Sequence, residues 1–127
     1  MNDASATIGQ LREVVERFVD RRDWHQFHTP KNLAMSLAIE AAELMEHFQW
    51  LTAEQSRAVA WQPEKLAEVA DELADVFCYL LAMANELGLD LAAALKAKMV
   101  KNAQKYPEEE YRGRFGPEDP NDPQDKP

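Results

Sequence analysis

The longest helix that the sequence predicts covers residues 63–87 and reads PEKLAEVADELADVFCYLLAMANEL. Pro63 suits the first turn of a helix, and Gly88, just past its end, is typical of a C-terminal stop. At about 100° per residue, apolar side chains recur on one side of this helix. They are Val69, Leu73, Val76 and Leu80. The stretch therefore predicts an amphipathic helix whose apolar stripe packs in a core.

The segments before and after this stretch carry helix signals of their own. Thr7 with Gln10 has the pattern of a capping box, and Thr29 before Pro30 is typical of a helix start. The sequence lacks the alternating apolar and polar runs that indicate strands. The further predicted helices cover about residues 8–22, 30–48 and 91–106, with a short turn at 52–58. We therefore predict an all-α fold, a four-helix bundle.

Composition limits the class of protein. The chain has 127 residues, 46% of them apolar, which fits one small domain with a core. A net charge of −9 argues against binding to a nucleic-acid polymer, which requires lysine and arginine. The single cysteine, Cys78, excludes a disulfide framework. The sequence shows neither a secretory signal nor an apolar run of roughly 18–20 residues, so we expect a cytoplasmic protein without a membrane partner.

The segment 107–127 differs in composition from the rest of the chain. It contains five of the seven prolines, with seven acidic and three basic residues. This composition predicts an acidic, proline-rich tail without regular structure, which either favours solubility or packs on a neighbouring subunit. The predicted organisation is one helical domain over 1–106 followed by this tail.

Two of the predicted helices each carry a pair of acidic residues that are three positions apart. Glu40 and Glu43 lie on the earlier helix, and Glu72 and Asp75 lie on the later one. In projection the second acid of each pair falls about 60° from the first, so each pair borders the apolar stripe. If the two helices pack by their stripes, four carboxylates converge where they meet.

A cluster of unpaired carboxylates is unfavourable, because like charges raise one another's pKa, and it therefore indicates a divalent cation. Mg²⁺ or Mn²⁺ takes oxygen ligands and keeps water positions that a phosphate can occupy. A di-iron centre is a rival, but its Glu-x-x-His pattern is absent. The alternative is an ordinary charged helix flank, although neither Lys31 nor Lys65 lies three or four positions from these acids.

The predicted C-terminal helix adds a basic strip. Its members, within roughly 100° of one another around the axis, are Lys98, Asn102, Lys105 and Tyr106. Binding of a polyphosphate requires cationic side chains on one side and a metal ion on the other, and the lysines of this strip could supply the cationic side. The alternative is the general preference of helix C-terminal ends for lysine.

Aromatic side chains gather at the ends of the helix over 30–48. Trp24, Phe27 and His28 precede it, Trp50 follows it, and Tyr79 flanks Glu72 on the next helix. Planar walls suit a nucleobase, which gains roughly 1–3 kcal/mol per stacked ring. The alternative is that these rings cover the ends of a small bundle.

The histidines and the single cysteine are interpreted as residues without a catalytic role. His25 and His28 are spaced to bind a metal, but histidines in such positions, like His47, are more often surface or hydrogen-bonding residues. Cys78 is interpreted as a buried small apolar residue, because no neighbouring base favours its thiolate.

Three runs of sequence, in this order, resemble the MazG-like all-α nucleotide pyrophosphohydrolases, and most closely the dCTP pyrophosphatase branch. They are RDWHQFHTPKNLAMSLAIEAAELMEHFQW (22–50), DELADVFCYLL (71–81) and KMVKNAQKYP (98–107). The similarity extends from about Leu11 to Tyr106. Its motif is Glu-x-x-Glu on one helix and Glu-x-x-Asp on the next, which matches the four acids above.

The resemblance implies roles for these residues. Glu40, Glu43, Glu72 and Asp75 would bind Mg²⁺, one or two ions. Trp24, His28, Trp50 and Tyr79 would form a base pocket. Lys98, Asn102 and Tyr106 would contact the phosphates or base of the nucleotide. Apart from the resemblance, we expect Lys98, aided by Lys105 and Tyr106, to act in catalysis by neutralising charge on the departing pyrophosphate. The resemblance also implies a homo-oligomer, either a dimer or a dimer-of-dimers tetramer.

The sequence thus predicts a Mg²⁺-dependent enzyme that cleaves a nucleoside triphosphate between its α and β phosphates. The expected substrate is dCTP or a modified dCTP, with removal of such nucleotides from the pool as the role. Of the four acids, Glu43 is weakly favoured as the acceptor of the attacking water's proton. The alternatives are the same chemistry on dUTP or on many triphosphates, and a helical interaction module without catalysis.

Overall fold

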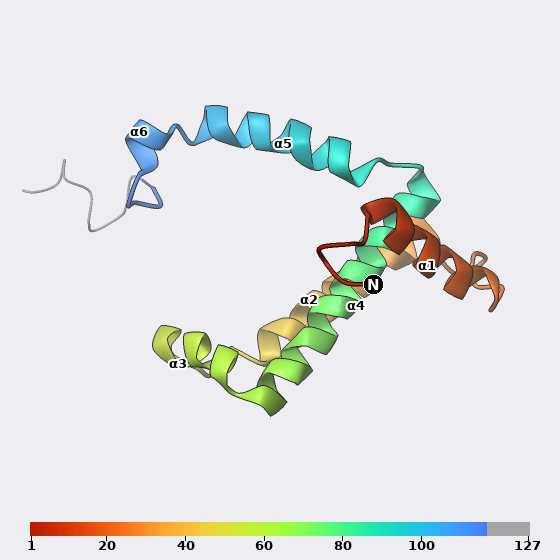
Figure 1. The fold of residues 1–127 in the computed structure, drawn as a ribbon, viewed down its shortest axis with the longest axis horizontal. Helices are drawn as coiled ribbons and strands as arrows, with labels where there is room; N and C mark the ends of the chain where they lie inside the picture. The colour runs from red at the N-terminus through yellow and green to blue at the C-terminus, as the bar shows by residue number, and fades with distance from the viewer. Residues whose placement is uncertain (117–127) are drawn as a thin grey trace, which may run out of the picture. The chain divides into compact units, whose positions relative to one another are not determined.

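The computed structural model describes residues 1–116, which contain helices and connectors but no strand. The predicted all-α fold class is therefore confirmed. The elements, labelled in Figure 1, are α1 (Ile8–Asp20), α2 (Pro30–Glu46), α3 (Ala53–Ala58), the 3₁₀ turn η1 (Val59–Trp61), α4 (Pro63–Leu87), α5 (Leu91–Lys105) and α6 (Glu108–Tyr111).

The predicted local signals set the helix starts and the end of α4. The Thr7 hydroxyl accepts a hydrogen bond from the Gln10 backbone N–H at 3.2 Å, and the Gln10 side chain accepts one from the Thr7 N–H at 2.8 Å. Thr29 caps α2 in a similar way by accepting from the N–H of Asn32 at 3.2 Å. Gly88 follows α4 with φ of 62°, a left-handed conformation that glycine adopts at little steric cost.

Helices α1 and α2 each end about two residues earlier than predicted. At both ends the backbone changes to tighter hydrogen bonds that span three residues. The Arg22 N–H donates to Val19 O at 3.1 Å, and the Phe48 N–H donates to Met45 O at 3.0 Å. These turns belong to the connectors, so the apolar periodicity that predicted the helices overstates their length.

Packing divides the chain into two compact units, Met1–Leu89 and Asp90–Pro127. The predicted domain over 1–106 includes the first unit and α5 of the second. In the first unit α2 lies alongside α4, and α1 also packs on α4 (Figure 1). The first unit therefore contains three of the four long helices expected in a bundle, and α5 belongs to the second unit.

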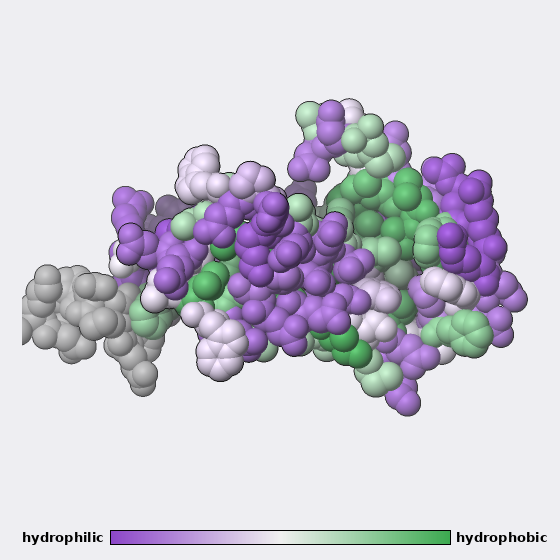
Figure 2. Space-filling view, turned by 90° about the horizontal axis from the view of Figure 1, so that it is seen from below, coloured by the Kyte–Doolittle hydropathy of each residue, from purple (hydrophilic) through white to green (hydrophobic). Residues whose placement is uncertain are grey.

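The core of the first unit forms where α1, α2 and α4 meet. Its buried apolar residues are Val15, Val19, Leu33, Val59, Val69, Leu81, Ala82 and Ala84. Not all of the stripe predicted on α4 is buried, because Leu73 and Leu80 are 52% and 40% exposed. Figure 2 shows hydrophobic surface of this kind left open among hydrophilic residues. The stripe on α4 is thus wider than the surface that α1 and α2 cover.

The second unit contains α5 and the single turn α6. The rings of Tyr106, which follows α5, and Tyr111 of α6 meet edge to face with their centroids 5.2 Å apart. This turn lies inside the segment 107–127, which the sequence predicted to be irregular throughout, and residues 117–127 lie outside the described part of the chain. A short helix at this point follows from Pro107, which suits a helix start, and from the acidic residues of its first turn.

Within residues 1–116, no single helix is both long enough and apolar enough to cross a bilayer. Helices α4 and α5 meet such criteria only when they are counted together across the break between them.

Candidate active site

Helices α2 and α4 bring together three of the four acids that the sequence singled out. One oxygen from each of Glu40, Glu43 and Glu72 lies within 4.8 Å of the other two. Asp75, one turn beyond Glu72, is near enough for its charge to act on Glu40. The predicted convergence of carboxylates between the two helices is therefore present in a single chain.

Electrostatics within this acid cluster are unfavourable when no cation is bound. Burial raises the pKa of the Glu40 carboxyl, and the charge and hydrogen bond of Glu43 raise it further. Asp75 and Glu72 add smaller contributions to the pKa of Glu40 in the same direction. Within residues 1–116, none of these four carboxylates forms an ion pair with a lysine or arginine. The cluster thus gathers negative charge without a compensating lysine or arginine among residues 1–116.

Two oxygens of the cluster are buried and lack a partner. They are Oε2 of Glu40 and Oε2 of Glu72, one from each helix. Because a buried carboxylate oxygen without a hydrogen bond is costly, such a pair requires a ligand. Oxygen donors on facing helices are the ligands that a hard divalent cation prefers. The residues present therefore fit a metal ion.

A histidine and a lysine support one side of the acid cluster. The Lys65 ammonium donates to Nδ1 of His47 at 2.8 Å. The other ring nitrogen, Nε2, lies 3.6 Å from Oε1 of Glu72. Sequence reasoning treated His47 as an ordinary histidine. Its position one helical turn after Glu43 was the available signal, but the link to Lys65 depends on the packing of α2 against α4.

A cavity of about 260 Å³ adjoins the acid cluster and shares Asp75 with it. Three of the four residues predicted for a ring-lined pocket, Trp24, His28 and Tyr79, lie on its wall. The other lining residues, which sequence reasoning did not assign to it, are Val15, Phe18, Val19, Cys78 and Ala82. The connector after α1 therefore contributes to the same cavity as α4.

The rings of this cavity are in mutual contact. Trp24 meets Phe18 edge to face with centroids 5.7 Å apart, and its centroid lies 6.1 Å from that of His28. Nδ1 of His28 is buried without a hydrogen-bond partner. The cavity therefore offers aromatic surface together with one open polar position, which suits a flat group with polar edges.

Trp50 and Cys78 lie in other positions than the sequence suggested. Trp50 does not line this cavity, since it stands in the turn after α2 and is 87% exposed, and its place in a base pocket stays a prediction. Cys78 is not a core residue, since its position on α4 places it on the cavity wall. Partial burial and the charge of Asp75 raise the pKa of the Cys78 thiol, so it is poorly suited to act as a nucleophile.

The predicted basic strip lies in the second unit. Lys98, Asn102 and Lys105 are on α5, and Tyr106 follows its last residue. Lys105 Nζ lies 5.3 Å from the centroid of the Tyr106 ring, and the Asn102 amide contacts the sulfur of Met99 at 3.8 Å. These residues therefore form a cationic and aromatic strip on the end of α5.

A family model and individual relatives both show what this chain is similar to. A model of the MazG-like family matches residues 35–114. The chain is 41% identical over 107 residues to dCTP pyrophosphatase 1 of Rattus norvegicus, covering 84% of this chain and 63% of that protein. It is 40% identical over 101 residues to the Homo sapiens protein of the same name, covering 80% of this chain and 59% of that one. The chain thus spans less than two thirds of the length of these relatives.

A solved structure extends the similarity to the fold. The crystal structure of a pyrophosphatase from Archaeoglobus fulgidus matches with a TM-score of 0.73 at 38% identity. The match covers 84% of this chain and 98% of the archaeal one.

Proposed function

Because this chain belongs to the MazG-like family, we propose that it is a nucleoside triphosphate pyrophosphohydrolase that acts on dCTP. The products would be dCMP and pyrophosphate. One observation carries the proposal: a cluster of carboxylates with two unpartnered buried oxygens lies beside a cavity lined with rings. Asp75 links the two, because it lines the cavity and its charge acts on Glu40. The similarity to relatives named dCTP pyrophosphatase 1 supports dCTP, or a modified dCTP, as the substrate.

The acids would hold the metal. We assign this role to Glu40, Glu43, Glu72 and Asp75, with Mg²⁺ as the expected ion and Mn²⁺ as a substitute. When bound, the ion supplies charge neutralisation at the phosphates and lowers the pKa of a coordinated water. His47 would orient Glu72 as an outer-shell partner, in the way that such groups usually support metal ligands.

The chain's own residues would then carry out the proton and charge transfers. A water molecule attacks the α-phosphorus, the bond to the bridging oxygen breaks, and pyrophosphate leaves with that oxygen. We favour Glu43 as the acceptor of the water's proton, because it is the more exposed of the two cluster acids on α2, Glu40 and Glu43. Their chemistry and the family resemblance lead us to assign Lys98, Asn102, Lys105 and Tyr106 to the phosphates and the leaving pyrophosphate.

The ring-lined cavity would bind the base. Trp24 and Tyr79 offer aromatic surface for stacking, and the open Nδ1 of His28 can form a hydrogen bond with a polar edge of the base. Trp50 does not line this cavity, and we assign it to base binding from the family resemblance alone. A free deoxynucleoside triphosphate as substrate also places the proposed activity in the cytoplasm, in the clearance of unwanted nucleotides.

A homo-oligomer is part of the proposal. Large apolar side chains remain exposed on both helices that carry the acids, among them Met35, Ile39, Leu73 and Phe77. A second copy of the chain would bury such faces, which a small core alone leaves open to water. A dimer or a dimer-of-dimers tetramer would satisfy this requirement.

The test is pyrophosphate release from a panel of nucleotides in the presence of Mg²⁺. We expect turnover of dCTP or a modified dCTP above that of dUTP and the ribonucleotides. Glu43→Gln should abolish release while the protein stays folded. Glu46→Gln, on the same helix and equally exposed but outside the cluster, is the matched control and should stay active. Full activity of Glu43→Gln, or no release from any nucleotide, would contradict the proposal.

A further inference from the structure

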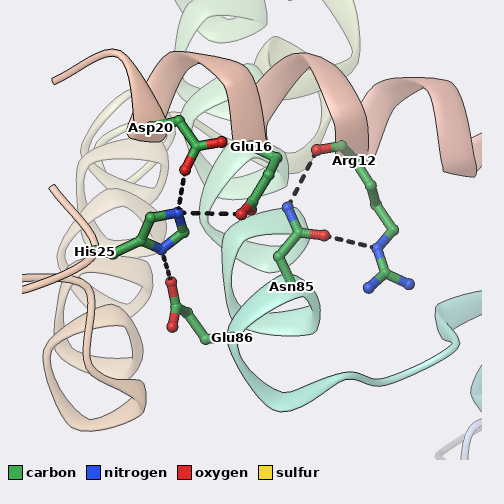
Figure 3. A network of polar contacts seen from close by, with 6 residues as sticks. All are labelled: Arg12, Glu16, Asp20, His25, Asn85 and Glu86. Carbon is green, nitrogen blue, oxygen red and sulfur yellow. Dashed lines mark hydrogen bonds and ion pairs between the residues drawn. The ribbon is translucent and has the colours of Figure 1, made fainter. Parts of the chain in front are cut away.

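One histidine of the connector between α1 and α2 contacts both α1 and α4, in addition to the backbone bond from the Trp24 N–H to Val19 O at 3.2 Å. His25 lies among three carboxylates that come from two helices, as Figure 3 shows. Its Nε2 lies 2.8 Å from Asp20 and 3.0 Å from Glu16, both on α1. Its Nδ1 lies 2.5 Å from Glu86 near the end of α4. We call these four residues the His25 clamp.

The geometry of the clamp indicates the protonated form of the ring. A neutral imidazole has one N–H donor, whereas here both nitrogens face carboxylate oxygens, which are only acceptors. Hydrogen bonds to Glu86 and Asp20 raise the pKa of His25, and the nearby charge of Glu16 raises it too, against the opposing effect of desolvation. These three acids, from α1 and α4, are the titratable groups that face the ring. The clamp is thus a cation surrounded by three anions.

Movement of His25 would carry the neighbouring rings with it. The backbone N–H of His28 donates to the carbonyls of both Trp24 and His25, at 3.0 and 3.2 Å. The segment from Trp24 to His28 is therefore one hydrogen-bonded turn. Trp24 and His28, at the two ends of this turn, line the cavity, and His25, its second residue, belongs to the clamp.

The helices that hold the clamp are fixed independently of it. Arg12 on α1 donates to the side chain of Asn85 at 2.8 Å and to the carbonyls of Leu89 and Ala84 at 2.6 and 3.2 Å. Asn85 donates back to the Arg12 carbonyl at 3.1 Å (Figure 3). Because arginine stays charged throughout the accessible pH range, this joint between α1 and α4 does not respond to the state of His25.

We infer that His25 is a positioning residue whose charged ring holds the 24–28 turn against α1 and α4, and thereby sets Trp24 and His28 on the wall of the cavity. The consequence for substrate binding rests on the proposed function, whereas the position of Trp24 does not. Sequence reasoning predicted a surface or hydrogen-bonding role for His25, and the structure shows hydrogen bonds but also the partner from α4. Glu16 and Asp20 were visible in the sequence, but Glu86 is 61 positions away and reaches the ring through the fold.

The clamp predicts a direction for the pH response. A histidine whose folded-state pKa is raised is charged below its ordinary pKa of about 6.5 and loses its charge as the pH rises through the folded value. The clamp is therefore closed at pH 6 and opens as the pH rises through the raised folded-state pKa. When it is open, the Trp24 ring should be more accessible to solvent and less well placed for a base.

The first experiment follows Trp24 alone, without metal or nucleotide. In a Trp50→Phe, Trp61→Phe background, Trp24 is the remaining tryptophan, and its quenching by acrylamide is measured from pH 5.5 to 9.5. We expect the quenching constant to rise about twofold with the loss of the His25 proton. In His25→Gln it should be high at every pH, and in His25→Arg, a permanent cation, low at every pH. The control Gln26→Ala, in the same connector, should behave like the parent.

The second experiment measures kinetics with dCTP and Mg²⁺. His25→Gln should raise KM about three- to tenfold with little change in kcat, because a displaced wall weakens binding more than the chemical step. A pH response of Trp24 that persists unchanged in His25→Gln overturns the inference, whether or not nucleotides are hydrolysed. An intact clamp response without hydrolysis of any nucleotide overturns the proposed function alone. A normal clamp response with unchanged KM overturns the positioning role.

Discussion

Two clusters of three or more carboxylates lie on α4 and its neighbours, and they differ in how their charge is balanced. In the His25 clamp, the imidazolium contacts Glu16, Asp20 and Glu86 at 2.5 to 3.0 Å. In the acid cluster between α2 and α4, the charges of Glu43, Asp75 and Glu72 act on Glu40 with no lysine or arginine partner in residues 1–116, and two buried oxygens are unpartnered.

The contrast separates a structural cluster from a binding cluster. A cluster that contains its own cation is complete and has no need of a ligand. A cluster of buried carboxylates that lacks one is unstable by itself and gains from any divalent ion that enters. The two clusters should therefore respond oppositely to charge removal and to added metal.

The largest expected effect is on activity. Replacing Glu40 with glutamine removes one charged oxygen donor from the acid cluster and should reduce pyrophosphate release from dCTP by about 10²–10³-fold, as for the loss of other preorganised electrostatic groups. The matched change in the clamp, Glu86→Gln, should leave kcat within about threefold, because Glu86 lies outside the reacting region.

The same pair of variants should shift metal-free stability in opposite directions. Glu40→Gln relieves repulsion and should raise Tm, whereas Glu86→Gln removes a partner of the His25 cation and should lower Tm. Each shift should be a few degrees, which corresponds to a change of about 0.5–1 kcal/mol in the free energy of unfolding. Differential scanning calorimetry in the presence of a chelator measures both. Equal destabilisation by the two substitutions would remove the distinction between the clusters.

The second prediction concerns added metal. Mg²⁺ at about ten times its dissociation constant should stabilise the protein by about 1.4 kcal/mol, because it binds the folded state. The resulting rise in Tm should disappear in Glu72→Gln and persist in His25→Gln, whose site is unrelated to the acid cluster. A Tm rise that is lost in His25→Gln and kept in Glu72→Gln would instead place the ion in the clamp.

The two clusters also differ in how far the sequence could predict them. The acid cluster follows from local periodicity, since the i, i+3 spacing beside an apolar stripe places Glu40, Glu43 and Glu72 where two helices meet. The clamp does not, because Glu86 joins His25 only after α4 has packed on α1. Helix starts were predictable from Thr7 and Thr29 for the same local reason.

Other features depend on packing that one sequence does not specify. The exposure of Leu73 and Leu80 reflects how much of α4 its neighbours cover, and periodicity gives only the direction of an apolar face. The position of Trp50 depends on a connector, where no repeating pattern constrains the ring. The boundary between the compact units, after Leu89, coincides with the Gly88 stop but gave no other signal.

The third prediction tests the support of the acid cluster. His47→Gln removes the imidazole that faces Glu72, and outer-shell substitutions of this kind typically weaken metal affinity about 10- to 100-fold. Isothermal titration with Mn²⁺ should show a loss near the lower end of that range, because His47 Nε2 is 3.6 Å from the carboxylate oxygen. Glu68→Gln, which removes another partner of Lys65, is the control and should change affinity less than threefold.

The smallest expected effect is on the pH dependence of stability, where both clusters act with the same sign in different windows. A carboxyl with a raised pKa binds its proton more tightly in the folded state, so Glu40 makes metal-free stability fall as the pH rises above about 4.5. His25 with its raised pKa makes stability fall as the pH rises above about 6.5. Because the His25 ring is partly exposed, its step should be about 3 °C or less in Tm.

Added metal separates the two steps. Saturating Mg²⁺ should abolish the step of Glu40, at lower pH, since the ion replaces the proton on the acid cluster. It should leave the step of His25, at higher pH, which His25→Gln should remove. If Mg²⁺ abolished both steps, the two clusters would be one coupled system, and the clamp could no longer be regarded as complete without a ligand.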